Sequence, residues 1–84
     1  MNSDEVIRDI LRQNEAMAAI VDTLGEDDDL FEKGLDSFGS VQLMLGLEER
    51  FEVEFPDTLL NRRSFSTLRI IRETVAKLSM GAAA

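Results

Sequence analysis

The sequence contains no cysteine and no histidine. The absence of cysteine excludes disulfide bonds, and the absence of both residues excludes the usual zinc sites. A serine hydrolase also needs a base, normally histidine, to activate its nucleophile, so this class of reaction is disfavoured. Apolar packing must therefore hold together a chain of 84 residues, which is the size of one small domain.

Long hydrophobic runs are also missing. The longest run is Leu43–Leu47, whereas a helix that spans a bilayer needs about 20 apolar residues. Met1–Glu5 lacks the basic residues that begin a signal peptide. These features predict a cytoplasmic protein that does not enter a membrane. Apolar residues still make up 44% of the chain, which is enough for a core and too much for a disordered segment.

Positive charge is scarce, and the net charge is −8. Residues 1–36 hold 11 acids and 3 bases, whereas residues 61–84 hold 1 acid and 5 bases. Direct binding to nucleic acid is disfavoured, because phosphate contacts need a positive surface. The acidic surface either attracts a basic protein partner or serves solubility alone.

The spacing of apolar residues predicts three main helices and one short helix. They are expected at residues 3 to 20 or 21, 37–52 and 57–61, and after Ser66 or Thr67, which would cap the last helix. Ser3 and Asp36 are the other expected N-caps, and residues 53–56 are expected to be extended before the proline. The fold class is therefore all-α, a small antiparallel four-helix bundle with a long first loop.

The whole chain, residues 1–84, is predicted to be a single domain. Its ordered core is expected at about residues 3–79, and a C-terminal tail of residues 80–84 is expected to fray.

The predicted loop at residues 25–36 contains four consecutive acids, residues 26–29, which must face water. A calcium-binding EF-hand loop would need glycine at its sixth position, but Glu32 stands there when the loop is counted from Asp27. No metal site is therefore predicted. The residues expected to anchor the loop on the core are Leu30, Phe31 and Leu35.

Ser37 is the main candidate functional residue. It lies at the predicted first turn of a helix, directly after Asp36. A serine there is either an ordinary helix-start residue or a point of attachment for another group. A group attached through a phosphodiester would place its negative charge at the positive end of the helix, so the position suits such a modification.

The helix predicted after Ser37 has more apolar residues than one buried face needs. One stripe contains Leu43, Met44, Leu47 and Phe51. A second stripe contains Phe38, Val41 and Leu45. The second stripe either packs in the core or forms an exposed docking strip, with Gln42, Glu48 and Glu49 at its border.

Leu35–Leu43 resembles the modification segment of the acyl carrier proteins, in which the motif is Asp-Ser-Leu. Glu48–Phe51 and Glu54–Asp57 resemble the end of the family's second helix and its proline turn, and the similarity covers residues 5–78. The resemblance implies that a phosphopantetheinyl transferase uses coenzyme A and Mg²⁺ to attach 4′-phosphopantetheine to Ser37. It also implies a non-catalytic carrier that other enzymes act upon.

Some residues depart from the fatty-acid carriers. Phe38 replaces the usual leucine, and Gly39 and Gln42 stand where those carriers have acids. The Asp-Ser-Phe-Gly sequence is closer to the D-alanyl carrier proteins, and Ser40–Gly46 together with Phe55–Phe65 resembles the aminoacyl carrier proteins. Stand-alone ligases that resemble the seryl-tRNA synthetase core load the latter group with small amino acids, so a glycine or alanine type of cargo is expected.

Two alternatives stay open from the sequence. The first is a carrier of fatty acyl or polyketide chains, and the second is an unmodified acidic helical interaction module. The predicted docking face consists of Phe38, Val41, Gln42, Leu45 and Glu49. Arg62 and Arg63 form either a second docking surface or a solvated basic pair. A monomer is expected, because it suits a shuttle between enzymes.

Overall fold

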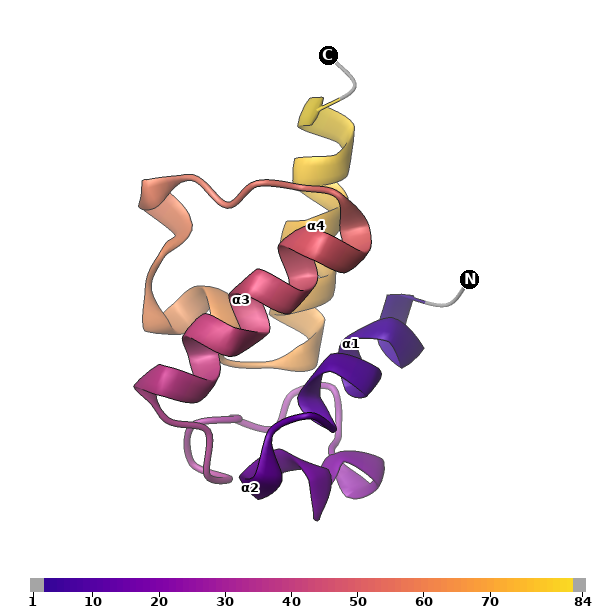
Figure 1. Cartoon of the computed structure of the whole chain (residues 1–84), viewed down its shortest axis with the longest axis vertical. Helices are drawn as coiled ribbons and strands as arrows, with labels where there is room; N and C mark the ends of the chain where they lie inside the picture. The colour runs from indigo at the N-terminus through magenta and orange to yellow at the C-terminus, as the bar shows by residue number, and fades with distance from the viewer. Residues whose placement is uncertain (1–2, 83–84) are drawn as a thin grey trace.

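The computed structural model describes residues 3–82, with side chains for residues 3–79. Within this range the chain is helical and contains no strand, which confirms the predicted all-α fold. The elements are α1 (Ser3–Leu11), α2 (Glu15–Ala18), η1 (Val21–Thr23), α3 (Ser37–Phe51), η2 (Asp57–Leu59), η3 (Arg62–Phe65) and α4 (Leu68–Ala82). Helices α1, α3 and α4 contact one another, and the segment between α3 and α4 loops out to one side (Figure 1).

The first predicted helix is wrong in its extent. The chain leaves the α-helix after Leu11, and α2 begins four residues later. Asn14 caps α2, because its side-chain oxygen accepts a hydrogen bond of 3.2 Å from the Met17 N–H. Asparagine favours such a cap over a helix interior. The apolar periodicity continues across the break because Leu11 and Met17 are buried in the same core.

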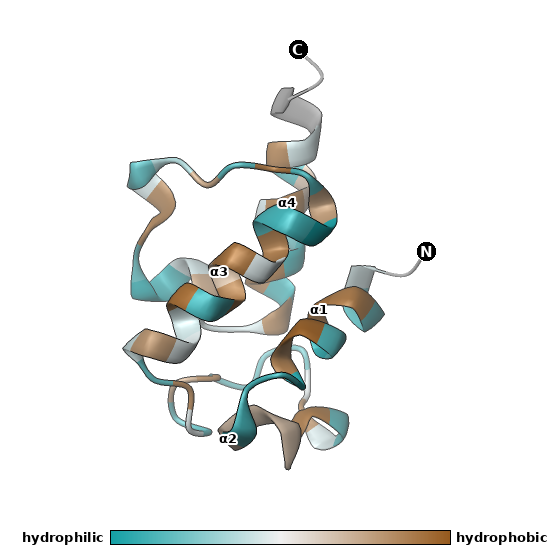
Figure 2. Cartoon of the chain, viewed as in Figure 1, coloured by the Kyte–Doolittle hydropathy of each residue, from teal (hydrophilic) through white to brown (hydrophobic). Residues whose placement is uncertain are grey.

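The core is formed by apolar side chains from α1, α2, α3 and α4 and from the loop before α3. The buried apolar residues are Val6, Ile7, Ile10, Leu11, Met17, Val21, Leu24, Leu30, Leu35, Leu43, Leu47, Val53, Phe55, Phe65, Leu68, Ile71 and Val75. Two of the three predicted loop anchors are therefore in the core, and the third, Phe31, packs against it. The hydrophilic residues of α1 lie on its side away from α3 (Figure 2).

Helices α1 and α3 approach closely at Gly46. A Cβ atom at this position would lie 2.6 Å from Cγ2 of Ile10, which is closer than real side chains pack. Glycine is therefore required here by the close approach and not by backbone conformation. The small residue allows α3, which begins at Ser37, to pack closely against α1.

Basic residues of α4 hold the acidic loop in place. Arg69 binds the carboxylate of Asp27 with an N–O distance of 2.8 Å, and Arg72 pairs with Glu26. The backbone reinforces this attachment, because the Leu30 N–H donates to the Ser66 carbonyl at 2.8 Å. The hydrogen bond from Arg69 lowers the pKa of Asp27 and raises the pKa of Arg69. Part of the charge asymmetry of the sequence is thus neutralised within the fold.

The connection from α3 to α4 differs partly from the prediction. Residues 53–56 are extended, as expected, and the Phe55 N–H donates to Oε2 of Glu48 at 2.8 Å. The predicted short helix at residues 57–61 is instead the 3₁₀ turn η2. The reason is that Asn61 caps a further turn, η3, by accepting a hydrogen bond of 3.0 Å from the Ser64 N–H. Asn61 thus starts a second turn that the sequence analysis did not predict.

The last helix begins and ends close to the predicted limits. The Thr67 hydroxyl accepts a hydrogen bond of 3.1 Å from the Ile70 N–H, which makes Thr67 the cap of α4. The helix continues to Ala82, beyond the expected end of the ordered core. Residues 83–84 of the predicted frayed tail lie outside the described residues. Among residues 3–82, every helix is too short or too polar to cross a membrane.

Candidate functional site

The chain around Ser37 is held in one position by capping and by close packing. Asp36 occupies the N-cap position of α3, and its Oδ1 accepts a hydrogen bond of 2.7 Å from the Gly39 N–H. A Cβ atom on Gly39 would lie 2.6 Å from Nδ2 of Asn14 and 2.8 Å from Cδ1 of Leu35. The first turn of α3 is therefore fixed against the loop before it and against the start of α2.

The Ser37 hydroxyl itself takes no part in this local structure. Ser37 is exposed, and Asp36 already supplies the cap of the helix. Ser40 donates a hydrogen bond of 2.8 Å to the Ser37 carbonyl, but within the described residues no hydrogen bond engages the Ser37 hydroxyl. The hydroxyl is thus available for chemistry at the positive end of a 15-residue helix.

A groove of about 450 Å³ lies beside Ser37. Its walls come from the loop before α3, from α3 itself and from the η2–η3 segment. The lining residues are Phe31, Leu35, Asp36, Ser37, Ser40, Val41, Met44, Leu60, Asn61, Arg62 and Phe65. Apolar side chains form most of this lining, so the groove could hold an extended chain attached at Ser37.

Met44, Leu60 and Phe65 line the groove and were not predicted from the sequence. The groove joins segments that are separate in the sequence, so no single motif marks it. The Leu59–Leu60 pair was the available signal, because two adjacent apolar residues in a 3₁₀ turn cannot both face the core. Leu59 packs against the core, whereas Leu60 is 46% exposed.

The second apolar stripe of α3 is exposed. Phe38, Val41 and Leu45 have relative exposures of 71%, 51% and 54%, so the alternative that they pack in the core is wrong. Exposed apolar strips of this kind mark sites of interaction. Only Val41 of the three also lines the groove beside Ser37.

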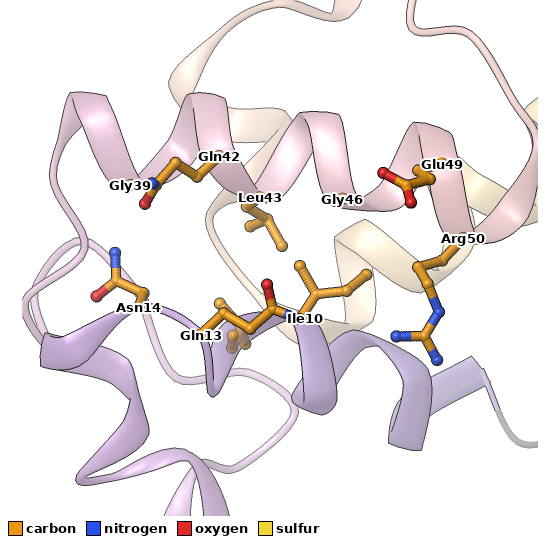
Figure 3. A pocket seen from close by; sticks show the side chains of 10 residues that line it. Ile10, Gln13, Asn14, Gly39, Gln42, Leu43, Gly46, Glu49 and Arg50 are labelled. Carbon is orange, nitrogen blue, oxygen red and sulfur yellow. The ribbon is translucent and has the colours of Figure 1, made fainter.

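Gln42 and Glu49 are exposed on the other edge of this strip. They line a second hollow, of about 220 Å³, between α1 and α3. Figure 3 shows Ile10 of α1 pointing toward α3, opposite Leu43 and Gly46. The five residues predicted for the docking face are therefore all exposed, and they lie between two hollows.

Arg62 and Arg63 are both exposed, but they occupy different surroundings. The Arg62 guanidinium lies 4.4 Å from the centroid of the Phe31 ring and lines the groove beside Ser37. Arg63 lines neither this groove nor the second hollow. The structure thus separates two residues that the sequence analysis treated as one surface.

Comparisons with known proteins agree with this architecture. A family model described as a phosphopantetheine attachment site matches residues 5–77. The aminoacyl carrier protein of Agrobacterium fabrum is 52% identical over 69 residues, which cover 82% of this chain and 83% of that protein. The D-alanyl carrier protein of Streptococcus uberis is 41% identical over 54 residues, which cover 63% of this chain and 68% of that protein.

A solved structure supports the same relationship. The similar chain belongs to the crystal structure of an engineered Bradyrhizobium japonicum glycine:[carrier protein] ligase complexed with a carrier protein from Agrobacterium tumefaciens and ATP. The TM-score is 0.83 and the identity is 48%, covering 89% of this chain and 97% of that chain. The resemblance seen in the sequence is therefore confirmed. This chain belongs to the phosphopantetheine-binding carrier proteins, which bear 4′-phosphopantetheine as a covalently attached group.

Proposed function

We propose that this chain carries a small amino acid as a thioester on a 4′-phosphopantetheine arm attached to Ser37. The observation that supports this most directly is the exposed Ser37 hydroxyl, which the fold leaves unbonded at the capped start of α3. The relatives named aminoacyl and D-alanyl carrier proteins support an amino acid as cargo. The glycine:[carrier protein] ligase in the similar complex supports glycine or a residue of similar size.

The residues around Ser37 fit this arm. A phosphodiester on Oγ would stand at the positive end of α3, which favours negative charge. The groove beside Ser37 offers apolar side chains such as Val41, Met44 and Leu60 to the chain that follows the phosphate. When bound, the group supplies a terminal thiol, which this chain lacks because it has no cysteine.

Attachment requires a phosphopantetheinyl transferase and coenzyme A. The Ser37 oxygen forms a bond to the β-phosphorus, the bond between the two phosphates breaks, and the adenosine bisphosphate part leaves. The hydroxyl proton passes to a base of the transferase or to water, because the described residues of the groove offer only the capping carboxylate of Asp36. This chain is therefore a substrate in the reaction and contributes no catalytic residue.

The exposed strip of α3 is the surface that we assign to these partners. Phe38, Val41 and Leu45 supply apolar contact area, and Gln42 and Glu49 supply polar contacts at its edge. The partners are the phosphopantetheinyl transferase, a stand-alone aminoacyl:carrier-protein ligase and an acceptor enzyme that takes the amino acid. A monomer, organised as one domain over residues 1–84 and working in the cytoplasm, suits this exchange.

The intact mass of the protein tests the attachment site. The chain is coexpressed with a phosphopantetheinyl transferase, and the same is done for the Ser37→Ala variant and for Ser40→Ala, a matched change one helical turn away. We expect the wild type and Ser40→Ala to gain one phosphopantetheine and Ser37→Ala to gain none. A wild type that stays unmodified would refute the carrier function and favour an unmodified interaction module.

Loading tests the cargo. The modified protein is incubated with ATP and either an aminoacyl:carrier-protein ligase with glycine or alanine, or a fatty-acyl ligase with a long-chain acid. We expect an aminoacyl thioester, seen as a hydroxylamine-sensitive gain in mass. Acylation by the fatty-acyl ligase together with no loading by the aminoacyl ligase would refute the amino-acid cargo while leaving the arm in place.

A further inference from the structure

Arg62 lies over an aromatic ring at the edge of the groove beside Ser37. It is the first residue of η3, and its guanidinium lies over the Phe31 ring at 4.4 Å from the centroid. Phe31 belongs to the loop that leads into α3, and it is itself partly buried against the core. This cation–π contact restrains a long side chain that would otherwise be mobile. The positive charge is therefore held on the groove that also contains Ser37.

The groove carries one charge of each sign. Among the described residues that line it, Asp36 is the only carboxylate and Arg62 is the only cation. A phosphodiester on Ser37 would add a second negative charge on the residue that follows Asp36, and like charges on adjacent residues repel each other. The start of α3 offsets part of this repulsion, but Asp36 already occupies the Gly39 N–H.

Other polar groups nearby are already engaged. The Asn61 side chain accepts from the Ser64 N–H at 3.0 Å and donates to the Thr58 carbonyl at 3.1 Å. Four other arginines already form ion pairs with carboxylates, namely Arg8, Arg12, Arg69 and Arg72. Arg62 is the group on the groove with donors to spare, and the planar guanidinium suits a phosphate better than a lysine does.

We propose that Arg62 positions the arm by pairing its guanidinium with the phosphodiester on Ser37. This inference rests on the proposed attachment at Ser37 and adds a role that the sequence analysis did not give. Arg62 acts within the carrier, whereas Arg63 does not line the groove and is given no part in this pairing. The arm is then directed along the groove toward Met44 and Leu60 instead of extending freely from the helix start.

Nuclear magnetic resonance tests the pairing without any enzyme activity. The ¹⁵N-labelled protein is compared before and after modification, and the Nε–Hε signals of the arginines are followed. We expect the Arg62 signal to shift on modification and the Arg63 signal to stay, and we expect the shift to shrink as salt is added. The ³¹P resonance of the modified protein should move in Arg62→Gln and stay unchanged in the matched variant Arg63→Gln.

A second measurement separates pairing from general stability. For each variant, the unfolding equilibrium is measured before and after modification, so that effects on the fold alone cancel. Modification should raise the folding equilibrium constant of the wild type more than that of Arg62→Gln. We expect the two increases to differ by a factor of about two to five, which is the range of an exposed ion pair. Arg62→Lys should recover part of this difference, and Arg63→Gln should match the wild type.

The outcomes distinguish this inference from the proposed function. If Ser37 accepts no phosphopantetheine, both are refuted. If Ser37 is modified but the Arg62 and ³¹P signals do not respond, the pairing is refuted and the carrier function stands. An equal response of Arg62 and Arg63 would also refute it, because it would indicate only the general field of the phosphate.

Discussion

The close approach of α1 and α3 predicts that Gly46→Ala destabilises the protein. Helix propensity alone predicts the opposite, because alanine in a helix interior is favoured over glycine by about 1 kcal/mol. The new Cβ would lie 2.6 Å from Cγ2 of Ile10, and this methyl group cannot move away easily because it branches from the Ile10 Cβ. Overpacking of this kind costs about 1–3 kcal/mol, so we expect a net loss of about 1 kcal/mol.

Urea unfolding monitored by circular dichroism measures this loss. The matched background is Ile10→Leu, which keeps the side-chain volume but moves the branch away from Gly46. In that background Gly46→Ala should be neutral or stabilising, and the double-mutant cycle should show a favourable coupling of about 1–3 kcal/mol. A gain in stability on Gly46→Ala in the wild-type background would refute the close approach of the two helices.

Three further predictions concern other parts of the fold. Arg8→Lys should lower the free energy of unfolding by about 1–3 kcal/mol, because the Arg8 guanidinium donates to the Asp4 carboxylate and to the carbonyls of Val21 and Leu24. An unchanged urea midpoint would contradict this. Asp27→Asn should be less stable at neutral pH, since Arg69 lowers the pKa of Asp27, and the difference should vanish as the pH falls below about 4 and the wild-type carboxylate is protonated; a pH-independent difference would argue against this pair. Phe38→Ala should reduce kcat/KM for the transferase or ligase at least fivefold, with stability within about 0.5 kcal/mol because the ring is exposed; Lys77→Ala on α4 is the control, and equal rates for all three proteins would exclude Phe38 from the interface.

The features that sequence reasoning predicted well are those with local physical causes. A short polar side chain before an apolar periodic segment predicted Ser66 or Thr67 as the cap of α4, and the structure selects Thr67, whose hydroxyl accepts from the N–H three residues later. Leu30 and Leu35 anchor the acidic loop for a similarly simple reason, since apolar residues between acids must find the core. The apolar pattern showed that α3 has more apolar residues than one buried face needs, but it left open whether the stripe with Phe38 is buried, and the structure shows this stripe exposed.

The features that could not be predicted depend on whether an asparagine caps a new helix or lies within a longer one. Asn14 could have been tolerated within a long helix, but as the cap of α2 it ends the first helix early. Asn61 likewise was expected to end a helix and instead begins η3. In both cases the apolar pattern on either side gave no sign of the break, because a core accepts residues from two short helices as readily as from one long helix.

The ion pairs between the acidic loop and α4 could not be located from the sequence for another reason. The opposite charges of residues 1–36 and 61–84 indicate that some pairing is possible, but they do not say whether the partner is another protein or the other end of the chain. The contact of Arg69 with Asp27 spans 42 residues and follows from the position of α4 against the loop. Charge patterning therefore showed the unequal distribution of charge along the chain and did not locate the ion pairs.

The arrangement of the interior bears on the cargo. A long acyl chain needs space between the helices, where Leu47, Leu68 and Ile71 are fully buried and the hollow between α1 and α3 measures about 220 Å³. The groove that begins at Ser37 lies on the surface instead, and it is lined at one side by the charged Arg62. A small amino acid at the end of the arm needs no interior cavity, so the limited space between the helices favours the proposed amino-acid cargo over a long acyl chain.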